Sequence, residues 1–126
     1  MHLRDVMNRH VRPISPDTVL EKAAQRISHL KSGWLLVCED HRIVGVITLR
    51  DLIVRATAQG CDPRTSTAQE VMTRRVICGR ENQNVEEAAR LMSRYRLSRM
   101  PVVDRYRHLV GIVNFADVRI VALARS

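Results

Sequence analysis

An internal repeat limits the folds open to this chain more than any other feature of its sequence. Residues 5–7 (Asp-Val-Met) are matched by residues 70–72 (Glu-Val-Met), and residues 45–51 are matched by residues 111–117. The offset grows from 65 residues at the first match to 66 at the second. Two long copies differ from a solenoid, in which many short units stack in a row. We therefore expect two similar halves, with function in the clefts between them.

The two halves are too short to be stable separately. The chain has 126 residues, which is the length of one typical domain, and a half of about 60 residues would be marginal on its own. We place repeat 1 at residues 1–59, a linker at residues 60–69 and repeat 2 at residues 70–126. We expect the repeats to fold as one cooperative unit.

The spacing of apolar residues predicts a β-α-β-β-α order in each copy, and hence an α+β fold. In repeat 1 a helix should begin with a capping-box pattern at Thr18 and Glu21 and end at Gly33. The other elements of this copy are expected at residues 11–14 (extended), 34–37 and 43–47 (strands), and from Thr48 to Gly60 (helix). Repeat 2 has the same order at residues 76–78, 85–97, 101–103, 109–113 and 115–124. Because residues 34–37 match residues 100–103, we place the extra residue between the first helix and the next strand.

The net charge favours an anionic partner. The formal charge is +8, from 21 basic and 13 acidic residues, and only Lys22 and Lys31 among the basic residues are lysine. Arginine suits planar, bidentate recognition of anions, so phosphate-bearing partners are favoured. Charge alone does not separate nucleotides from nucleic acid.

The cysteines and the apolar runs indicate a reducing, aqueous compartment. Cys38 and Cys78 fall inside apolar runs, while Cys61 is expected to be exposed in the linker, and their spacing is not that of a metal site. We expect reduced thiols. No apolar run reaches the roughly 18 residues of a membrane span, and the N-terminus lacks a signal-peptide pattern. We expect a cytoplasmic protein.

A repeated pattern at the end of an apolar strand carries the best chemical signal. Gly-x-x-Thr/Asn-x-x-Asp occurs at residues 45–51 and again at residues 111–117. It places a hydroxyl or amide and a carboxylate at the amino end of a helix, where free N–H groups and the helix dipole favour anions. Thr48 would bond a phosphate oxygen, and Asp51 would accept both hydroxyls of a ribose. The alternative is that Thr48 only caps the helix and Asp51 only complements its dipole.

These residues resemble a known family, the tandem CBS domains named after cystathionine β-synthase, which are called a Bateman module when paired. The resemblance covers residues 5–123. It is carried by the two Asp/Glu-Val-Met openings, by residues 100–104 (Met-Pro-Val-Val-Asp) and by both Gly-x-x-Thr/Asn-x-x-Asp segments. Together these markers are specific, whereas any one alone would be weak.

The resemblance implies two repeats packed sheet to sheet around a pseudo-twofold axis, with two nucleotide clefts. Each cleft would combine the ribose-binding Asp of one repeat with an adenine-contacting strand of the other. The implied residues of the first cleft are Thr48, Asp51, Thr73, Val76, Ile77 and Ser98. Those of the second cleft are Asn8, Val11, Arg12, Ser32, Asn114 and Asp117.

The first cleft follows the family pattern better. In the second, Asn114 replaces the usual Ser or Thr, Arg12 stands where an apolar residue is usual, and Trp34-Leu35 replaces the common small-Pro pair. The candidate phosphate contacts are arginines beside the expected strands, for which the alternative is a solvated surface cation: Arg74, Arg75 and Arg99.

The leading functional hypothesis is a stand-alone regulatory module that senses AMP, ADP, ATP or S-adenosylmethionine. The resemblance also implies a homodimer through the long helices, with Leu52, Ile53, Val118 and Val121 as apolar candidates for its surface. The alternative is a basic interaction module that binds RNA, DNA or an acidic protein, its nucleotide clefts vestigial. The spread of the histidines suggests no metal site, and no motif of catalysis or of a resident cofactor is found, so we expect binding and not turnover. The sequence does not name the ligand, the regulated partner or the dimer geometry.

Overall fold

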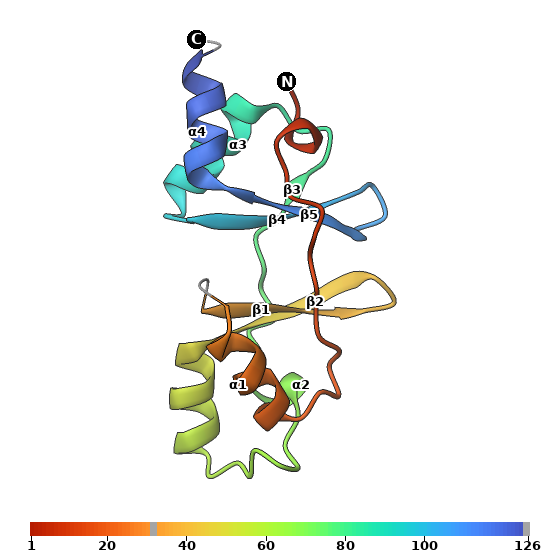
Figure 1. The fold of residues 1–126 in the computed structure, drawn as a ribbon, viewed down its shortest axis with the longest axis vertical. Helices are drawn as coiled ribbons and strands as arrows, with labels where there is room; N and C mark the ends of the chain where they lie inside the picture. The colour runs from red at the N-terminus through yellow and green to blue at the C-terminus, as the bar shows by residue number, and fades with distance from the viewer. Residues whose placement is uncertain (31–32, 125–126) are drawn as a thin grey trace. The chain divides into compact units, whose positions relative to one another are not determined.

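The computed structural model describes residues 1–30 and 33–124 and divides into two compact units. The repeat-1 unit comprises Arg12–Val76, and the repeat-2 unit comprises Met1–Val11 together with Ile77–Ser126. Each unit therefore takes one segment from the opening of the other copy. In Figure 1 the red N-terminal segment lies with the blue and cyan elements of repeat 2. The described residues include no helix that is long and apolar enough to cross a membrane.

The repeat-1 unit has helices on one face of a small sheet (Figure 1). Its elements are α1 (Leu20–Ser28), β1 (Trp34–Glu39), β2 (Arg42–Thr48), η2 (Asp51–Ala56, a π-helical segment) and α2 (Ala68–Val71). Strands β1 and β2 pair antiparallel. Single bridges extend this sheet on both sides, from Ile14 to Val37 and from Thr73 to Val46.

The repeat-2 unit repeats this arrangement. Its elements are η1 (Leu3–Asp5), β3 (Gly79–Arg80), α3 (Val85–Arg94), β4 (Arg99–Val103), β5 (Leu109–Asn114) and α4 (Phe115–Ala124). The sheet order is β3-β4-β5, with β3 parallel and β5 antiparallel to β4. A bridge between Asn8 and Ile112 adds the N-terminal segment beyond β5. The α+β class expected from the sequence is confirmed.

The helix of repeat 1 differs from its prediction at both ends. It begins at Leu20 without a side-chain cap, so the capping box at Thr18 and Glu21 is wrong. The reason is that backbone carbonyls of the connector take that role: Leu20 N–H donates to Ser66 O and Glu21 N–H to Pro63 O, both at 2.9 Å. The helix ends at Ser28, before the expected Gly33. Residues 60–69 are thus part of the repeat-1 unit, and Cys61 is half-buried against its core instead of exposed.

The extended segments are also shorter than expected. Residues 11–14 contribute only the bridge of Ile14, and the parallel strand of repeat 2 forms at Gly79–Arg80 instead of residues 76–78. Helix α1 buries Leu20, Ala23 and Ile27. The strands at residues 34–37, 43–47, 101–103 and 109–113 and the helices near residues 85–97 and 115–124 are confirmed within a few residues at their ends.

The extra residue of repeat 2 lies in the hairpin turn, so its predicted place before the strand is wrong. Trp34 pairs with Thr48 in one sheet, and Arg99 pairs with Asn114 in the other, so Trp34 is equivalent to Arg99 and not to Met100. The turn of repeat 1 has two residues, Asp40 and His41, both with positive φ (52° and 68°), as a type I′ turn requires. The turn of repeat 2 has one residue more and a positive φ of 66° at Arg107, as in a three-residue hairpin loop.

The matching Gly and Met residues of the two copies have a shared packing role. A Cβ atom on Gly45 would lie 2.6 Å from Met72 Sδ and 3.0 Å from Thr73 O, and one on Gly111 would lie 2.7 Å from Met7 Sδ and 2.9 Å from the backbone O of the next residue. In each unit the methionine and the backbone after it cross directly over the glycine. The repeated sequence anchors are therefore the residues that join the opening segment of one copy to the sheet of the other.

Candidate functional site

Asp51 lies at the junction of β2 and the following helical segment. Its side chain is 8% exposed. The Thr48 N–H donates to Asp51 Oδ2 at 2.9 Å, and the Asp51 N–H donates to Thr48 Oγ1 at 3.1 Å. This reciprocal pair has the geometry of a capping box. Thr48 and Asp51 thus have the helix-start role that the sequence left as an alternative, and they also form one small polar cluster.

Two further side chains reach the Asp51 carboxylate with longer contacts. The Thr73 hydroxyl lies 3.2 Å from Oδ1 and 3.4 Å from Oδ2. The Arg55 Nε lies 3.6 Å from Oδ1, while Arg55 Nη1 donates to Met72 O at 3.1 Å. Sequence reasoning missed Arg55, although its i,i+4 spacing from Asp51 was the available signal. Three residues of the repeat-1 unit therefore lie around the buried Asp51 carboxylate: Thr48, Thr73 and Arg55.

The equivalent carboxylate of repeat 2 has different surroundings. Asp117 is exposed, and its described partner is the Asn114 amide, whose Nδ2 donates to Asp117 Oδ2 at 3.3 Å. Asn8 occupies the place of Thr73, because each bridges the same position of the second hairpin strand. Asn8 Oδ1 instead accepts the N–H of His10 at 2.9 Å. The two copies of the motif therefore hold their carboxylates in unlike environments.

The remaining predicted residues belong to one unit or the other. Val76 is half-buried at the end of the repeat-1 unit, and Ile77 packs against the core of the repeat-2 unit. The Ser98 carbonyl accepts the N–H of Phe115 at 2.8 Å, and the Gly33 carbonyl accepts that of Leu49 at 3.1 Å. Gly33, not Ser32, is thus the structural equivalent of Ser98. Ser32 itself lies outside the described residues, and its role stays a prediction.

The other candidates for ligand contact lie at the surface or where the chain passes from one unit to the other. Val11 is half-buried at the end of the repeat-2 segment, and the Arg12 carbonyl accepts a bond from Arg26 Nη2 at 2.6 Å. The three candidate phosphate contacts are exposed: Arg74, Arg75 and Arg99. Their roles as ligand contacts stay predictions.

The thiols and histidines form no cluster suited to a metal within the part of the chain that the structure describes. Cys38 is buried, as expected of an apolar strand residue. Burial raises the pKa of the Cys78 thiol, and the nearby charge of Arg107 offsets part of that rise. Cys78 is therefore held in its neutral form at physiological pH.

Comparison with known proteins identifies a family that covers most of the chain. The sequence model of the CBS domain matches residues 3–56 and again residues 68–123. The CBS domain-containing protein YhcV of Bacillus subtilis is 34% identical over 118 residues, which are 94% of this chain and 83% of that protein. Hypoxic response protein 1 of Mycobacterium tuberculosis is 34% identical over 91% of this chain and 80% of its own length. Both relatives are similar in length to this chain.

Solved structures agree with this assignment. Hypoxic Response Protein I with two coordinated zinc ions superposes with a TM-score of 0.81 at 32% identity, covering 95% of this chain and 98% of that one. CBSX2 of Arabidopsis thaliana, in complex with AMP, has a TM-score of 0.78 at 27% identity and covers 98% and 97%. A CBS domain pair in complex with 5′-methylthioadenosine and S-adenosyl-L-methionine has a TM-score of 0.70 at 31% identity and covers 100% and 98%. The chain belongs to the CBS domain family and carries two copies of that domain.

Proposed function

We propose that this chain is a regulatory module that binds an adenosine-containing ligand through the cluster of Thr48, Asp51 and Thr73. AMP, ADP, ATP and S-adenosylmethionine are the candidates. The ligand would act by binding one conformation of the protein, or of its dimer, more tightly than another, since only a difference in affinity shifts such an equilibrium.

The observation that carries this proposal is the way Asp51 is held. Its short bond from the Thr48 N–H fixes the carboxylate at 2.9 Å, whereas the contacts from Thr73 and Arg55 are longer, at 3.2 to 3.6 Å. Bonds of that length are weak. Two ribose hydroxyls can replace them without loss of the anchoring bond. A carboxylate that is preoriented in this way recognises a vicinal diol better than the exposed Asp117 does.

The related structures support an adenosine ligand over other nucleosides. One neighbour was solved with AMP and another with 5′-methylthioadenosine and S-adenosyl-L-methionine. Those ligands share the adenosine moiety and differ in the group on the 5′ carbon. A ribose-binding Asp51 does not distinguish that group, so the class of ligand is proposed and its 5′ substituent is left to experiment.

A thermal-shift screen tests this function directly. A ligand that binds only the folded protein raises its stability, by about 2.7 kcal/mol at a concentration one hundred times its Kd. We expect at least one of AMP, ADP, ATP and S-adenosylmethionine to raise the melting temperature, with guanosine monophosphate as the matched control. If none of the four changes the melting temperature at millimolar concentration, the proposal is wrong.

Binding to nucleic acid is the second candidate function, and the surface of the repeat-2 unit favours it. That unit contains eleven arginines and six carboxylates. Tyr95 is 49% exposed, and the Arg94 guanidinium lies over its ring at 5.5 Å. Such a complex should weaken steeply as salt is added, because counterions are released on binding. A gel-shift titration with single-stranded RNA at low salt would exclude it if no complex forms.

A further inference from the structure

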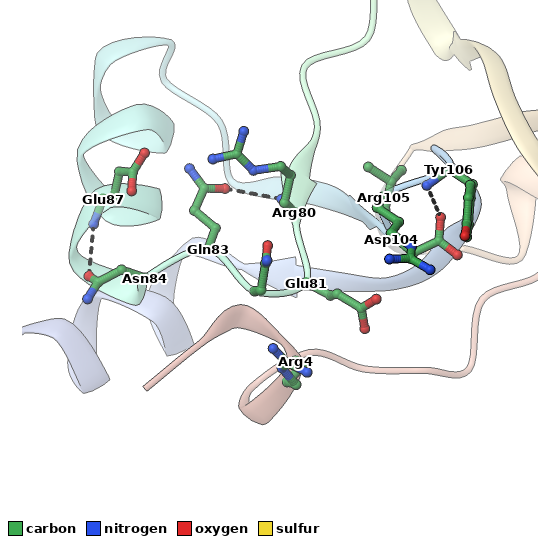
Figure 2. A pocket seen from close by; sticks show the side chains of 11 residues that line it. Arg4, Arg80, Glu81, Gln83, Asn84, Glu87, Asp104, Arg105 and Tyr106 are labelled. Carbon is green, nitrogen blue, oxygen red and sulfur yellow. Dashed lines mark hydrogen bonds between the residues drawn. The ribbon is translucent and has the colours of Figure 1, made fainter.

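A hollow within the repeat-2 unit contains none of the residues predicted for the nucleotide clefts. It has a volume of about 570 Å³, which lies in the usual range for small-molecule sites. Figure 2 shows its lining side chains, which come from the N-terminal segment, from β3, α3 and the loop between them, and from the end of β4 and the turn after it. The hollow is complete within a single unit.

Three arginines from separate segments line this hollow. Arg4 belongs to η1, Arg80 to β3 and Arg105 to the hairpin turn. Among the described residues, none of these guanidinium groups has a carboxylate within salt-bridge distance. The Arg105 guanidinium instead lies 4.8 Å from the centre of the Tyr106 ring, which is 54% exposed. The positive charge of Arg105 also acts on the neighbouring Asp104 carboxylate, so Arg4 and Arg80 have the donors most available to an anion.

The backbone that positions these arginines is well fixed. The Arg4 N–H donates to Glu81 O at 2.9 Å, and the Glu81 N–H donates to Val103 O at 3.0 Å. The Arg80 N–H donates to Gln83 Oε1 at 3.2 Å, as Figure 2 shows. Three chain segments are thus joined by hydrogen bonds around the hollow, so its shape does not depend on the arginine side chains.

The repeat-1 unit shows that the fold does not need arginine at these places. It has a corresponding hollow, lined by Ser15, Gln69 and Asp40 among others. Ile14 forms a parallel bridge to β1, and Gly79 pairs in parallel with β4 at the equivalent place. Ser15, which follows Ile14, is therefore equivalent to Arg80, which follows Gly79. Gln69 N–H donates to Pro16 O at 3.0 Å, as Arg4 N–H does to Glu81 O. The same scaffold therefore holds neutral or acidic residues in one copy and arginines in the other.

We propose that the repeat-2 hollow binds a nucleoside di- or triphosphate through its phosphate chain. Guanidinium groups from three directions suit an anion with several oxygens better than a single carboxylate, which one arginine satisfies. The exposed Tyr106 ring offers a stacking surface for the base. This site is independent of Asp51 and of the function proposed for it.

The carboxylates of the lining fit the same class of ligand. Asp104 is held within its own turn, where Oδ1 accepts the N–H groups of Tyr106 and His108 at 2.8 and 2.9 Å. Glu81 and Glu87 remain as acceptors for the hydroxyl or amino groups of a nucleoside. A ligand that carries phosphates alone would meet the charges of Glu81 and Glu87, besides that of Asp104, without compensation, so the nucleotide should bind more tightly than the bare phosphate chain.

Calorimetry with inorganic pyrophosphate and ADP tests the site in the full chain. The titrations use the Asp51→Asn variant, which lacks the proposed adenosine contact. In this variant ADP should bind more tightly than pyrophosphate. Arg80→Ser, which introduces the residue of the equivalent position, should weaken both by about tenfold or more, because a charge-assisted hydrogen bond is lost. Arg4→Gln should act in the same direction.

Arg119→Gln is the matched control, because Arg119 is an exposed arginine on α4 away from the hollow. It should leave both affinities nearly unchanged. Failure of pyrophosphate and ADP to bind at low salt would overturn the site, as would an equal loss in Arg80→Ser and Arg119→Gln. ADP that binds no better than pyrophosphate would overturn the nucleoside part. If AMP binds the wild type and Asp51→Asn equally well while these results hold, only the function proposed above is rejected.

Discussion

At the scale of single residues, identical sequence positions have different surroundings in the two copies. Asp51 and Asp117 occupy the same place in the repeated motif, yet one is buried among Thr48, Thr73 and Arg55 and the other is exposed. The sequence predicted that Thr48 and Asp51 lie together at the start of a helix, because their spacing is local. The contact with Thr73 joins residues 22 positions apart. Periodicity within one repeat does not predict such a contact, and the family resemblance suggested only that Thr73 belongs to the site.

The close approach over Gly45 gives a test at this scale. Gly45→Ala would place a methyl group against Met72 and the backbone of Thr73, and overpacking of this kind costs about 1 to 3 kcal/mol. Because Thr73 contacts Asp51, the same change should weaken adenosine-ligand binding. Chemical denaturation and calorimetry would measure the two effects. Gly111→Ala is the control, since it should lower stability while leaving the Asp51 cluster intact; unchanged stability in both variants would contradict this packing role.

At the scale of elements, the sequence predicted which helices and strands exist better than where they begin and end. Apolar spacing found the hairpins and long helices, because burial of one face repeats along each element. It misplaced the extra residue of repeat 2, since the apolar strand residues match almost equally well in two registers. Hydrogen bonding decides the register: the two-residue turn at Asp40 and His41 in repeat 1 corresponds to a three-residue turn in repeat 2. The start of α1 was missed because its cap comes from distant backbone carbonyls.

The last helical segment of each unit exposes apolar side chains, which we infer to be the surface of a homodimer. Val118 is fully buried and belongs to the core, so it is wrong as an interface candidate, while Leu52 and Val121 are half-buried. The exposed apolar residues of these segments are Ile53, Val54, Ile120 and Leu123. Exposed apolar side chains on a helix, as each unit has here, are typical of protein interfaces.

Sedimentation equilibrium tests the dimer. The wild type should have twice the chain mass of 14.4 kDa, and Ile53→Glu with Ile120→Glu should shift it to the single mass by placing charges in an apolar contact. Leu30→Glu, at an apolar residue that is 42% exposed beyond α1, should leave the dimer unchanged. A wild type that sediments as one chain at high micromolar concentration would reject the dimer.

At the scale of the whole molecule, the sequence predicted two similar halves but not the exchange of their opening segments. The Val-Met anchors are nearly the same in both copies, so each would fit the sheet of either repeat. The structure joins Met7 to Gly111 and Met72 to Gly45. Each compact unit therefore contains residues from both sequence repeats. Residues 60–69, which we assigned to a linker, belong to the repeat-1 unit, and residues 1–11, which we assigned to repeat 1, belong to the repeat-2 unit.

Amide hydrogen exchange in variants with one shortened core side chain tests which opening segment packs in which unit. Leu3 is fully buried with Val85 and Met100, so Leu3→Ala should cost about 2 to 5 kcal/mol of the stability of that core. Exchange should rise in α3 and β4 far more than in α1 and β1. Leu20→Ala, in the core of the repeat-1 unit, should give the reverse pattern. A rise in hydrogen exchange that is larger in α1 and β1 than in α3 and β4 in Leu3→Ala would contradict the exchanged arrangement.

Calorimetric titration with AMP of the wild type, Asp51→Asn and Asp117→Asn measures the central claim most directly. Asparagine keeps the shape of the side chain and removes the charge that accepts the ribose hydroxyls. We predict that Asp51→Asn weakens AMP binding by about tenfold or more, the loss expected when hydrogen bonds to a charged group are removed, while Asp117→Asn changes it far less. Equal affinity of the wild type and Asp51→Asn for AMP would contradict the account.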